Sequence, residues 1–523
     1  MTARKHLASV IAVLMMTAPS PADGPDKWYR DGRAAVESAK RLAPNRENAR
    51  NVILFIGDGM GVSTVTAARI LAGQIQGTPG EEKVLNFEKL PYTALIKTYN
   101  TNQQTPDSAG TMTAMVTGVK TKAGVLSMDE RTMRGDHADA NARRLTTILE
   151  LAERAGLSTG IVTTSSVTHA TPAALYAHSP ERAWQSDGNL PGEARSDGFP
   201  DIARQLIEFA EGNGVDVVLG GGRAFFLPDF LRDPEHSEIS GQRRDGRDLT
   251  AQWVKSERAV YVWNKSQFDA VDASATDRLL GLFEPDHMNY EHDRASDKAS
   301  EPSLSEMTAR AVDLLSKNSK GFFLMVEGAR IDHAHHATNP FRALTETIEF
   351  DKAVAAAKKK TNSGDTLIIV TADHGSSMTM GGYATRGNPI LGKVVHNNAR
   401  GEPASGPARD ALGLPYATLN YAAGPGYHGA SAEQPEGTKR FPHDGDGFRP
   451  ATIPRPDLSD VDTQDPDYLG ECMIPLGSGV HSGEDVPLYA GGPGAYMFHG
   501  VLEQNVIFHV MADALGLAGP ERQ

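Results

Sequence analysis

The stretch GFFLMVEGARIDHAHH, residues 321–336, joins an apolar run to two carboxylates and three imidazoles. Strands that are buried on both faces of a parallel sheet read as continuous apolar runs, without the alternation of a half-exposed strand. In open α/β sheets, ligands bind beyond the carboxyl ends of the strands. The stretch therefore predicts a buried parallel strand that delivers metal-type ligands at its C-terminal end.

Four further apolar runs of the same kind support a parallel sheet. They are NVILFIG, STGIVTT, VDVVLGG and TLIIVTA, at residues 51–57, 158–164, 215–221 and 366–372. Helical patterns lie between them, and the clearest has Asn339 as its N-cap and Pro340 at its first position. Alternating strands and helices predict an α/β fold: a three-layer core with a largely parallel central sheet flanked by helices.

The segment from Gly387 to Leu476 differs from the rest because it is rich in Gly, Pro, Asn and Asp. We expect a single domain over residues 23–523 that carries this segment as an irregular surface insertion. A disordered linker is the alternative. Against it stand four residues that are able to pack: Tyr416, Leu419, Tyr421 and Tyr427.

Composition narrows the class of protein. The chain has 523 residues, 39% hydrophobic and 23% charged, which is typical of a globular protein rather than a disordered one or a membrane bundle. Its formal charge of −14 argues against a nucleic-acid-binding surface, which needs a basic stripe. An anionic substrate would require local positive charge, and bound metal ions are able to supply it.

The N-terminus has the pattern of an export signal. Arg4 and Lys5 precede the apolar stretch Leu7–Met16, and Ser20 and Ala22 follow in an A-x-A-like arrangement. We expect a signal peptide over residues 1–22 and a periplasmic or secreted protein; a frayed N-terminal helix is the alternative. The C-terminal GLAGPERQ has no hydrophobic tail, so we expect no membrane anchor. The single cysteine, Cys472, excludes an intrachain disulfide.

Acids and imidazoles recur where the predicted strands end. Asp58, Glu327 and the pair Asp373-His374 directly follow such runs, and His169 and Thr171 come a little after another. A single Asp after a strand is often only a helix cap. Several at one edge of a sheet, beside the cluster at 327–336, favour a metal site instead.

Spacing within that cluster separates its members. Asp332 and His336 are four residues apart, so on a helical turn they share a face and can hold one ion. His335 would point away from that face. It would be either a surface histidine or a histidine that contacts the ligands without binding the ion. His333 lies beside Asp332 and is open to either a structural or a metal-supporting role.

The segment TPDSAGTMTAMVTG, residues 105–118, contains a candidate nucleophile. Its small residues have helix-compatible spacing, so Ser108 should lie at a helix N-terminus, where free N–H groups favour phosphates. Ser108 as a mere N-cap is the alternative. No G-x-S-x-G motif surrounds it. Activation of the serine by a coordinated metal ion is therefore the mechanism that the residues favour.

Eight motifs in the same order resemble those of alkaline phosphatases, from about Asn51 to Leu517. They are FIGDGMG, TPDSAG, THATPAALYAHSPERAW, VEGARIDHAHH, RALTETIEFDKAV, VTADHG, GGYATRGNPI and HSGEDVPLYAGGPGA. The resemblance implies a metal-dependent hydrolase of phosphate monoesters that forms a covalent phosphoserine at Ser108. It also implies that Arg182 clamps phosphoryl oxygens, that Asp107 orients this arginine, and that the enzyme is a homodimer.

The resemblance further implies three metal sites. One zinc ion would be held by Asp58, Ser108, Asp373 and His374. A second zinc ion would be held by Asp332, His336 and His481. A magnesium ion would be held by Asp58, Thr171 and Glu327. Oxygen-only ligands suit magnesium, and mixed His and Asp sets suit zinc, which agrees with these assignments.

The sequence departs from the best-known bacterial pattern near the magnesium site. His169 and His333 stand where that pattern has Asp and Lys, as in the animal-type enzymes, and we expect both imidazoles behind the ligands. Residues 387–476 occupy the position of the family's crown domain. Animal-type enzymes also have a fourth, calcium-like site. Its matching positions here are Glu235, the Phe283 carbonyl, Glu284 and Glu301.

Two other functions remain open from the residues. A phosphodiesterase or sulfatase of the same wider superfamily would share the metal ligands, although Ser108 with Arg182 favours monoesters. A non-catalytic zinc-binding protein would need the ligands but neither of those two residues. The sequence does not identify the physiological ester.

Overall fold

The computed structural model describes residues 25–517, so the predicted signal peptide at 1–22 lies outside the described residues. The chain divides into two compact units, Met1–Pro44 and Asn45–Gln523. In the first unit, helix α1 (Pro25–Lys40) exposes Trp28 and Tyr29. Across residues 25–517, none of the helices combines the length and apolarity needed to span a bilayer.

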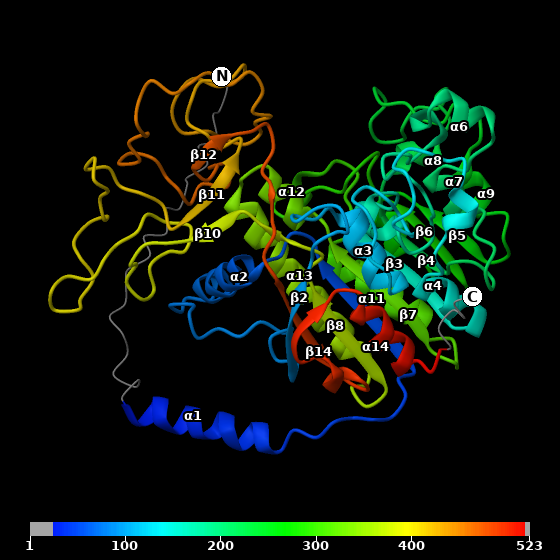
Figure 1. The fold of residues 1–523 in the computed structure, drawn as a ribbon, viewed down its shortest axis with the longest axis horizontal. Coiled ribbons are helices and arrows are strands. Elements are labelled where there is room, and N and C mark those ends of the chain that lie inside the picture. Colours follow the sequence, from blue (N-terminus) through cyan, green and yellow to red (C-terminus); the bar gives the residue numbers. More distant parts are fainter. Residues whose placement is uncertain (1–24, 518–523) are drawn as a thin grey trace, which may run out of the picture. The chain divides into compact units, whose positions relative to one another are not determined.

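The second unit is built on a ten-stranded sheet (Figure 1). Its order is β15-β2-β14-β8-β1-β7-β3-β4-β6-β5. All neighbouring pairs from β8 to β5 are parallel, and β14 alone runs against both of its neighbours. The strands are β1 (Asn51–Gly57), β2 (Tyr92–Lys97), β3 (Ser158–Ser166), β4 (Val217–Gly221), β5 (Ala259–Val262), β6 (Arg278–Leu282), β7 (Phe322–Gly328), β8 (Thr366–Thr371), β14 (Val486–Gly491) and β15 (Gly500–Glu503).

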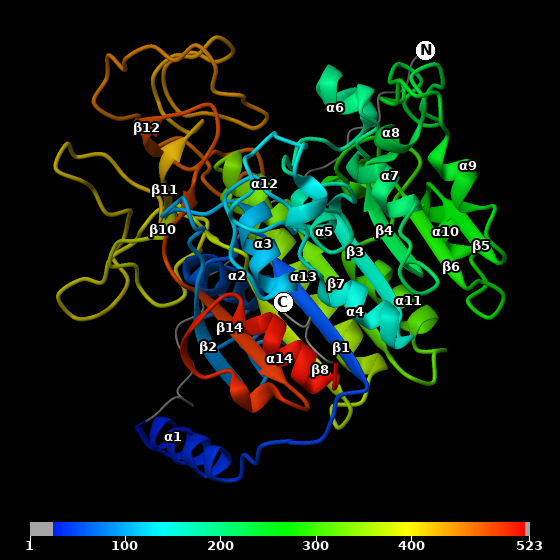
Figure 2. The same cartoon turned by 45° about the vertical axis from the view of Figure 1, so that its right-hand side comes forward.

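Helices cover both faces of this sheet, which confirms the predicted three-layer α/β core. One layer contains α2 (Val62–Ile75), α11 (Leu304–Leu315) and α13 (Pro340–Lys360), which pack on one another and on β1, β3 and β7. The other layer contains α3 (Ser108–Thr117), α4 (Ile148–Ala155), α5 (Ala170–Ala173) and α14 (Val506–Ala514). Figure 2 shows α3, α4 and α5 of this second layer beside β3 and β7.

All five predicted strands are present. β1 spans the predicted residues, and β7 continues past its apolar run to include Glu327, because this carboxylate is buried with the strand. The predicted helix is α13, and the Asn339 side chain accepts a hydrogen bond from the Arg342 N–H at 2.9 Å. Phe350 of α13 packs edge-on against Phe55 of β1, with ring centroids 5.8 Å apart.

The remaining helices are short and lie mainly beyond β3 and β4. They are α6 (Gly192–Ser196), α7 (Ile202–Ile207), α8 (Arg223–Phe226), α9 (Leu249–Trp253), α10 (Lys265–Asp269) and α12 (Arg330–His336). Helix α12 follows β7 directly and precedes α13, so it stands at the carboxyl edge of the sheet. It carries the Asp332 and His336 pair of the sequence motif.

Residues 387–476 contain little regular structure but are packed. β11 (Leu419–Gly424) is the middle strand of a three-stranded sheet near α12 in Figure 1, between β10 (Met378–Met380) and β12 (Cys472–Pro475). Leu419, Tyr421 and Cys472 are buried against α2 and α13. A two-stranded sheet joins β9 (Gly375–Ser376) to β13 (His481–Ser482) and brings His481 beside the end of β8.

Candidate active site

Ser108 opens helix α3 but does not cap it. The N-cap is Asp107, whose side chain accepts a hydrogen bond from the Gly110 N–H at 3.0 Å. Ser108 is the first helical residue and is buried, and its Oγ lies 3.3 Å from His374 Nε2. The capping role considered for Ser108 is therefore taken by its neighbour, and the hydroxyl is directed at the ligand cluster.

The first ligand cluster surrounds His374 Nε2. This nitrogen lies 3.3 Å from Ser108 Oγ, 3.4 Å from Asp58 Oδ1 and 3.3 Å from Asp373 Oδ2. Two donors of one tetrahedral zinc ion, each bound at about 2.0–2.2 Å, lie about 3.3–3.5 Å apart. The spacing of these four side chains therefore fits a single zinc ion.

The second cluster contains Asp332, His336 and His481. His336 Nε2 lies 3.0 Å from Asp332 Oδ2, one helical turn away on α12, and 3.2 Å from His481 Nε2. His481 Nε2 lies 3.8 Å from the other oxygen of Asp332. Asp332 and His336 share one face of α12, as the sequence predicts. His374 also lies within ligand distance of Asp332 and His481, so the two clusters adjoin.

All three imidazoles of these clusters have the orientation of metal ligands. Nδ1 of His336, His481 and His374 contacts the carbonyls of Gly479 at 2.6 Å, Pro106 at 2.8 Å and Gly375 at 3.2 Å, respectively. A carbonyl only accepts hydrogen bonds, so each Nδ1 carries a proton, and in the neutral ring each Nε2 presents its lone pair to the cluster. Two lone pairs that face each other at 3.2 Å require a proton or a metal ion between them.

A third cluster lies on the other side of Asp58. Asp58, Glu327 and His169 offer donor atoms within 4.8 Å of one another. Glu327 Oε2 accepts a hydrogen bond from Thr163 Oγ1 at 2.5 Å, whereas Glu327 Oε1 and Thr171 Oγ1 are buried without a hydrogen-bond partner among the described residues. Both carboxylate oxygens of Asp58 are likewise buried without a hydrogen-bond partner among the described residues. Buried oxygens left unpaired around one point fit a hard cation such as magnesium.

The carboxylates of this cluster lie in surroundings that disfavour their charged form. Burial, together with the neighbouring charges of Asp373, Asp332 and Glu327, raises the pKa of Asp58 well above its usual value. Burial also raises the pKa of Glu327 to about 7, even though Thr163 donates to it. Without positive charge, ionised carboxylates in this arrangement repel one another. Divalent cations would remove that repulsion.

Arg182 is held with its planar fork at the edge of the site. Its Nη1 donates to Asp107 Oδ2 at 3.1 Å, and its Nη2 donates to His169 Nε2 at 3.1 Å. Burial alone raises the pKa of Asp107, but Arg182 and the N–H groups of Gly110 and Gly124 outweigh burial and lower it. The predicted orientation of Arg182 by Asp107 is therefore matched by a direct contact.

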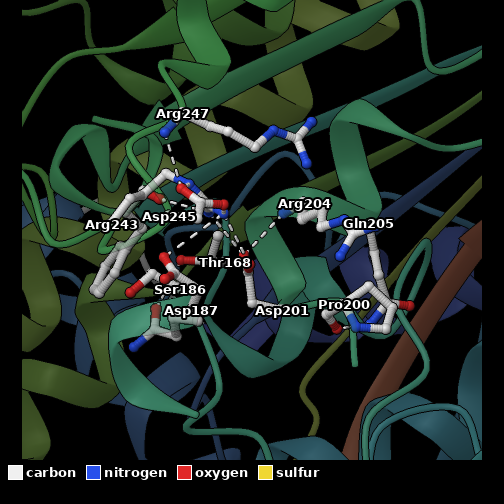
Figure 3. Close-up of polar contacts among 12 residues, drawn as sticks. Thr168, Ser186, Asp187, Pro200, Asp201, Arg204, Gln205, Arg243, Asp245 and Arg247 are labelled. Atoms are coloured by element: carbon white, nitrogen blue, oxygen red, sulfur yellow. Dashed lines mark hydrogen bonds and ion pairs between the residues drawn. The ribbon is translucent and has the colours of Figure 1, made fainter. Parts of the chain in front are cut away.

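A buried ionic network joins Asp187 and Asp201, which follow Arg182 in the chain, to residues 243–245 (Figure 3). Arg243 is fully buried, and it donates to both oxygens of Asp201 at 3.0 Å and to Asp245. The neighbouring Arg244 N–H donates to the Asp187 carboxylate at 3.1 Å. Removing one partner of such a network leaves an uncompensated buried charge, which costs about 3–5 kcal/mol. The network therefore fixes the chain just after Arg182.

A fourth cluster lies away from Ser108, where β6 ends. Glu235, His236 and Glu284 offer donor atoms within 4.8 Å of one another, and Phe283 precedes Glu284 in the chain. Glu301 is buried nearby but is not part of that group of three. Burial and the charges of Glu284 and Asp297 raise the pKa of Glu301 to about 9. Its role as a ligand stays a prediction.

Several residues at these sites were missed by sequence reasoning. His287 packs between His169 and His333, with ring centroids 5.4 and 4.3 Å away, and no strand end or spacing pointed to it. His236 and Asp297 at the fourth cluster likewise had no signal in the sequence. His335 is buried rather than exposed: it contacts Thr64 and Tyr421, not the ligands. His333 contacts Arg330 at 3.0 Å.

Known proteins resemble this chain over most of its length. The family model described as alkaline phosphatase matches residues 49–517. The tissue-nonspecific alkaline phosphatase of Gallus gallus is 43% identical over 512 residues, with 96% of this chain and 92% of the relative covered. The alkaline phosphatase of Gadus morhua is 41% identical, with 95% and 98% covered. The crystal structure of Thermus thermophilus alkaline phosphatase superposes with a TM-score of 0.62 at 25% identity, covering 92% of this chain and 94% of that one.

Proposed function

The chain belongs to the alkaline phosphatase family and is a phosphoric monoester hydrolase, and we propose that Ser108 is its nucleophile. The supporting observation is the position of Ser108 Oγ, buried at the N-terminus of α3 and 3.3 Å from His374 Nε2. A helix N-terminus favours anions, and a zinc ion held by the adjoining ligands would favour deprotonation of the hydroxyl.

The metal ligands in this proposal are those of the three clusters. Asp58, Ser108, Asp373 and His374 would hold one zinc ion, and Asp332, His336 and His481 the other. Asp58, Thr171 and Glu327 would hold magnesium, with His169 beside them. When bound, the three ions supply the positive charge that favours a serine alkoxide and stabilises the departing oxygen.

The reaction follows as two displacements at phosphorus. Ser108 Oγ, having lost its proton to solvent, attacks the phosphorus atom; the bond to the alcohol oxygen breaks, the departing oxygen takes a proton from solvent, and a phosphoserine and a free alcohol result. Water then loses a proton and attacks the same phosphorus atom, and the bond to Ser108 Oγ breaks to release inorganic phosphate, which leaves Ser108 ready to attack again. Arg182 donates its two terminal N–H groups to phosphoryl oxygens, which a planar fork matches better than an ammonium does. Asp107 and His169 hold that fork in place.

Substitution of the nucleophile tests the proposal. Ser108→Ala should lose at least about 10³-fold in kcat with nitrophenyl phosphate, because the covalent step has no other hydroxyl in place. Ser482→Ala is the control, since that hydroxyl contacts Glu484 at 3.2 Å and has no proposed role. Undiminished hydrolysis by Ser108→Ala would contradict the proposal.

Two rival functions are separated by simple assays. A phosphodiesterase would hydrolyse the bis-nitrophenyl ester faster than the monoester at equal concentration. A non-catalytic zinc-binding protein would hydrolyse neither ester. We expect the monoester to be preferred, because a monoester has three non-bridging oxygens, enough for the fork of Arg182 and for a metal ion together, whereas a diester has only two.

We also propose export and a homodimer. The N-terminal pattern at residues 1–22 supports export, and N-terminal sequencing of the mature protein is its test. Met473 and Ile474 on β12 and Met380 on β10 are exposed apolar side chains of one small sheet, which supports a contact with a second copy. Light scattering on the purified protein would reveal the dimer. The fourth cluster stands where the resemblance implies a calcium-like site, and His236 adds a nitrogen donor to its carboxylates.

A further inference from the structure

The fourth cluster gathers more negative charge than its protein neighbours neutralise. Its carboxylates are Glu235, Glu284, Asp297 and Glu301. The buried cation beside them, Arg223, is already paired with Asp233 through two hydrogen bonds of 2.6 and 2.8 Å. Arg223 Nη2 comes no closer to Glu235 Oε2 than 3.6 Å.

Three buried oxygens of this cluster have no hydrogen-bond partner within the described part of the chain. They are Glu235 Oε2, Asp297 Oδ2 and Glu301 Oε2. The Glu235 side chain is only 1% exposed, and its other oxygen accepts the Ala299 N–H at 2.8 Å. An ordered protein rarely leaves such oxygens unpaired. The Glu235 and Asp297 carboxylates also lie within hydrogen-bond reach of each other, which requires a cation or a shared proton between them, and a cation would satisfy the Glu301 oxygen as well.

One donor of the cluster is a nitrogen. His236 Nε2 lies 3.3 Å from Glu284 Oε2, close to the separation of about 3.3–3.5 Å between two ligands of a tetrahedral zinc ion. The Glu284 Oε1 atom accepts a hydrogen bond from Asn289 Nδ2 at 2.9 Å, which fixes the carboxylate and leaves Oε2 for the ion. His236 follows Glu235 directly, and its own N–H donates to Asp233 at 2.9 Å, so the turn that holds Arg223 also holds the imidazole.

We infer that this cluster binds zinc, or a similar transition-metal dication, in preference to calcium, with His236 as a nitrogen ligand beside Glu235 and Glu284. Calcium takes oxygen ligands, whereas imidazole suits zinc and its neighbours in the first transition row. Two carboxylates and one imidazole form a zinc-type donor set with a position left for water. The inference goes beyond the proposed function and does not depend on Ser108.

The test is a count of ions bound to the holoenzyme. Wild-type protein and variants are equilibrated with zinc, magnesium and calcium together, separated from unbound ions, and analysed for each element per chain. We expect His236→Gln to hold one zinc ion fewer per chain than wild type and one calcium ion more, because an amide oxygen replaces the imidazole nitrogen. Equal zinc counts, with calcium bound in both proteins, would show His236 to be only an ion-pair partner of Glu284 and would overturn the inference.

Two further measurements keep the result interpretable. His292→Gln is the matched control, since the His292 side chain is 37% exposed against 35% for His236, and it should keep the wild-type counts. Glu235→Gln should lose the fourth ion while the others stay; a retained ion would place the site elsewhere and contradict the inference. If His236→Gln does not fold, a competition experiment on the wild-type protein replaces it. Displacement of one zinc ion per chain by equimolar calcium would then refute the preference of the fourth cluster for zinc. Phosphoserine formation at Ser108 is a separate readout, so either proposal can fail alone.

Discussion

At the scale of single residues, Arg182 has the most specific task in the proposed mechanism. Arg182→Ala should raise KM and the inhibition constant of inorganic phosphate by about 10- to 100-fold, because hydrogen bonds to a charged group are worth ~1.5–3 kcal/mol. Steady-state kinetics with phosphate as competitive inhibitor measure both. Arg134→Ala is the control, since Arg134 is paired with Glu181 at 2.7 Å and should leave both constants near wild type. Complete loss of turnover would show that Arg182 does more than bind the phosphoryl group.

Glu153 gives a prediction on pH at the same scale. Burial, with a contribution from Asp216, raises its pKa to about 8 in the folded protein, although Thr159 donates to it. A raised acid contributes stability below its unfolded pKa near 4.5 and loses it as pH rises through about 8. Each unit of that shift corresponds to about 1.4 kcal/mol.

Glu153→Gln removes this titration. The free energy of unfolding of the variant, relative to wild type, should rise from pH 5 to pH 8 and then level off, as measured by urea unfolding. Glu211→Gln should give a flat difference over that range, because hydrogen bonds from Arg154 lower the pKa of Glu211. A flat profile for Glu153→Gln as well would refute the assignment.

At the scale of elements, a buried hydrogen bond connects the insertion to the ligand-bearing helix α12. Tyr421 Oη on β11 lies 2.9 Å from His335 Nδ1, and His335 Nε2 lies 3.0 Å from Thr64 Oγ1 on α2. Tyr421→Phe leaves a buried imidazole nitrogen unpaired and should lower the free energy of unfolding by about 1–3 kcal/mol.

A second tyrosine of the insertion supplies the comparison. Tyr468 is buried, and its hydroxyl has no hydrogen-bond partner in the part of the chain that is described. Tyr468→Phe should therefore change stability by less than about 0.5 kcal/mol. Equal losses in the two variants, measured by denaturant unfolding, would mean that the Tyr421 contact contributes nothing.

The elements also show which parts of the fold a sequence can predict. β1 and β7 are buried along their whole length, so their apolar runs were unambiguous. β2 and β15 are short and partly exposed, and neither was predicted, because burial there follows the neighbours rather than a local pattern. The pairing of β14 against β8 is a tertiary fact with no local signal.

At the scale of the whole molecule, both the activity and the stability of the protein should depend on its bound metal ions. A strong chelator should abolish hydrolysis and lower Tm by on the order of 10 °C, because Asp58, Asp373 and Glu327 then only repel one another. Zinc with magnesium should restore both properties. Calorimetry alongside the activity assay measures the two properties together. Loss of activity without a fall in Tm would show that the ions do not stabilise the fold, which would contradict the prediction.

The part of the proposed site that follows the strands could be predicted from the sequence alone, whereas the roles of Arg182 and His481 came only from the family resemblance. Parallel strands end at one edge, so Asp58, Glu327, Asp373 and His374 had to meet there once the sheet was inferred. His236 and Asp297 were not predictable, because they lie 61 residues apart in loops whose meeting depends on Arg223 and β6. The ends of predicted strands therefore indicate the ligands at the carboxyl edge of the sheet, but they do not indicate clusters that are formed by loops.

The most direct test of the central claim is the location of the phosphoryl group on the protein. Enzyme mixed with a phosphate monoester at low pH, quenched in acid and digested, should yield one phosphorylated peptide, and fragmentation should assign the phosphoryl group to Ser108. The same peptide from chelator-treated enzyme should carry none. A phosphoryl group on any other residue, or turnover with the Ser108 hydroxyl never modified, would contradict the account.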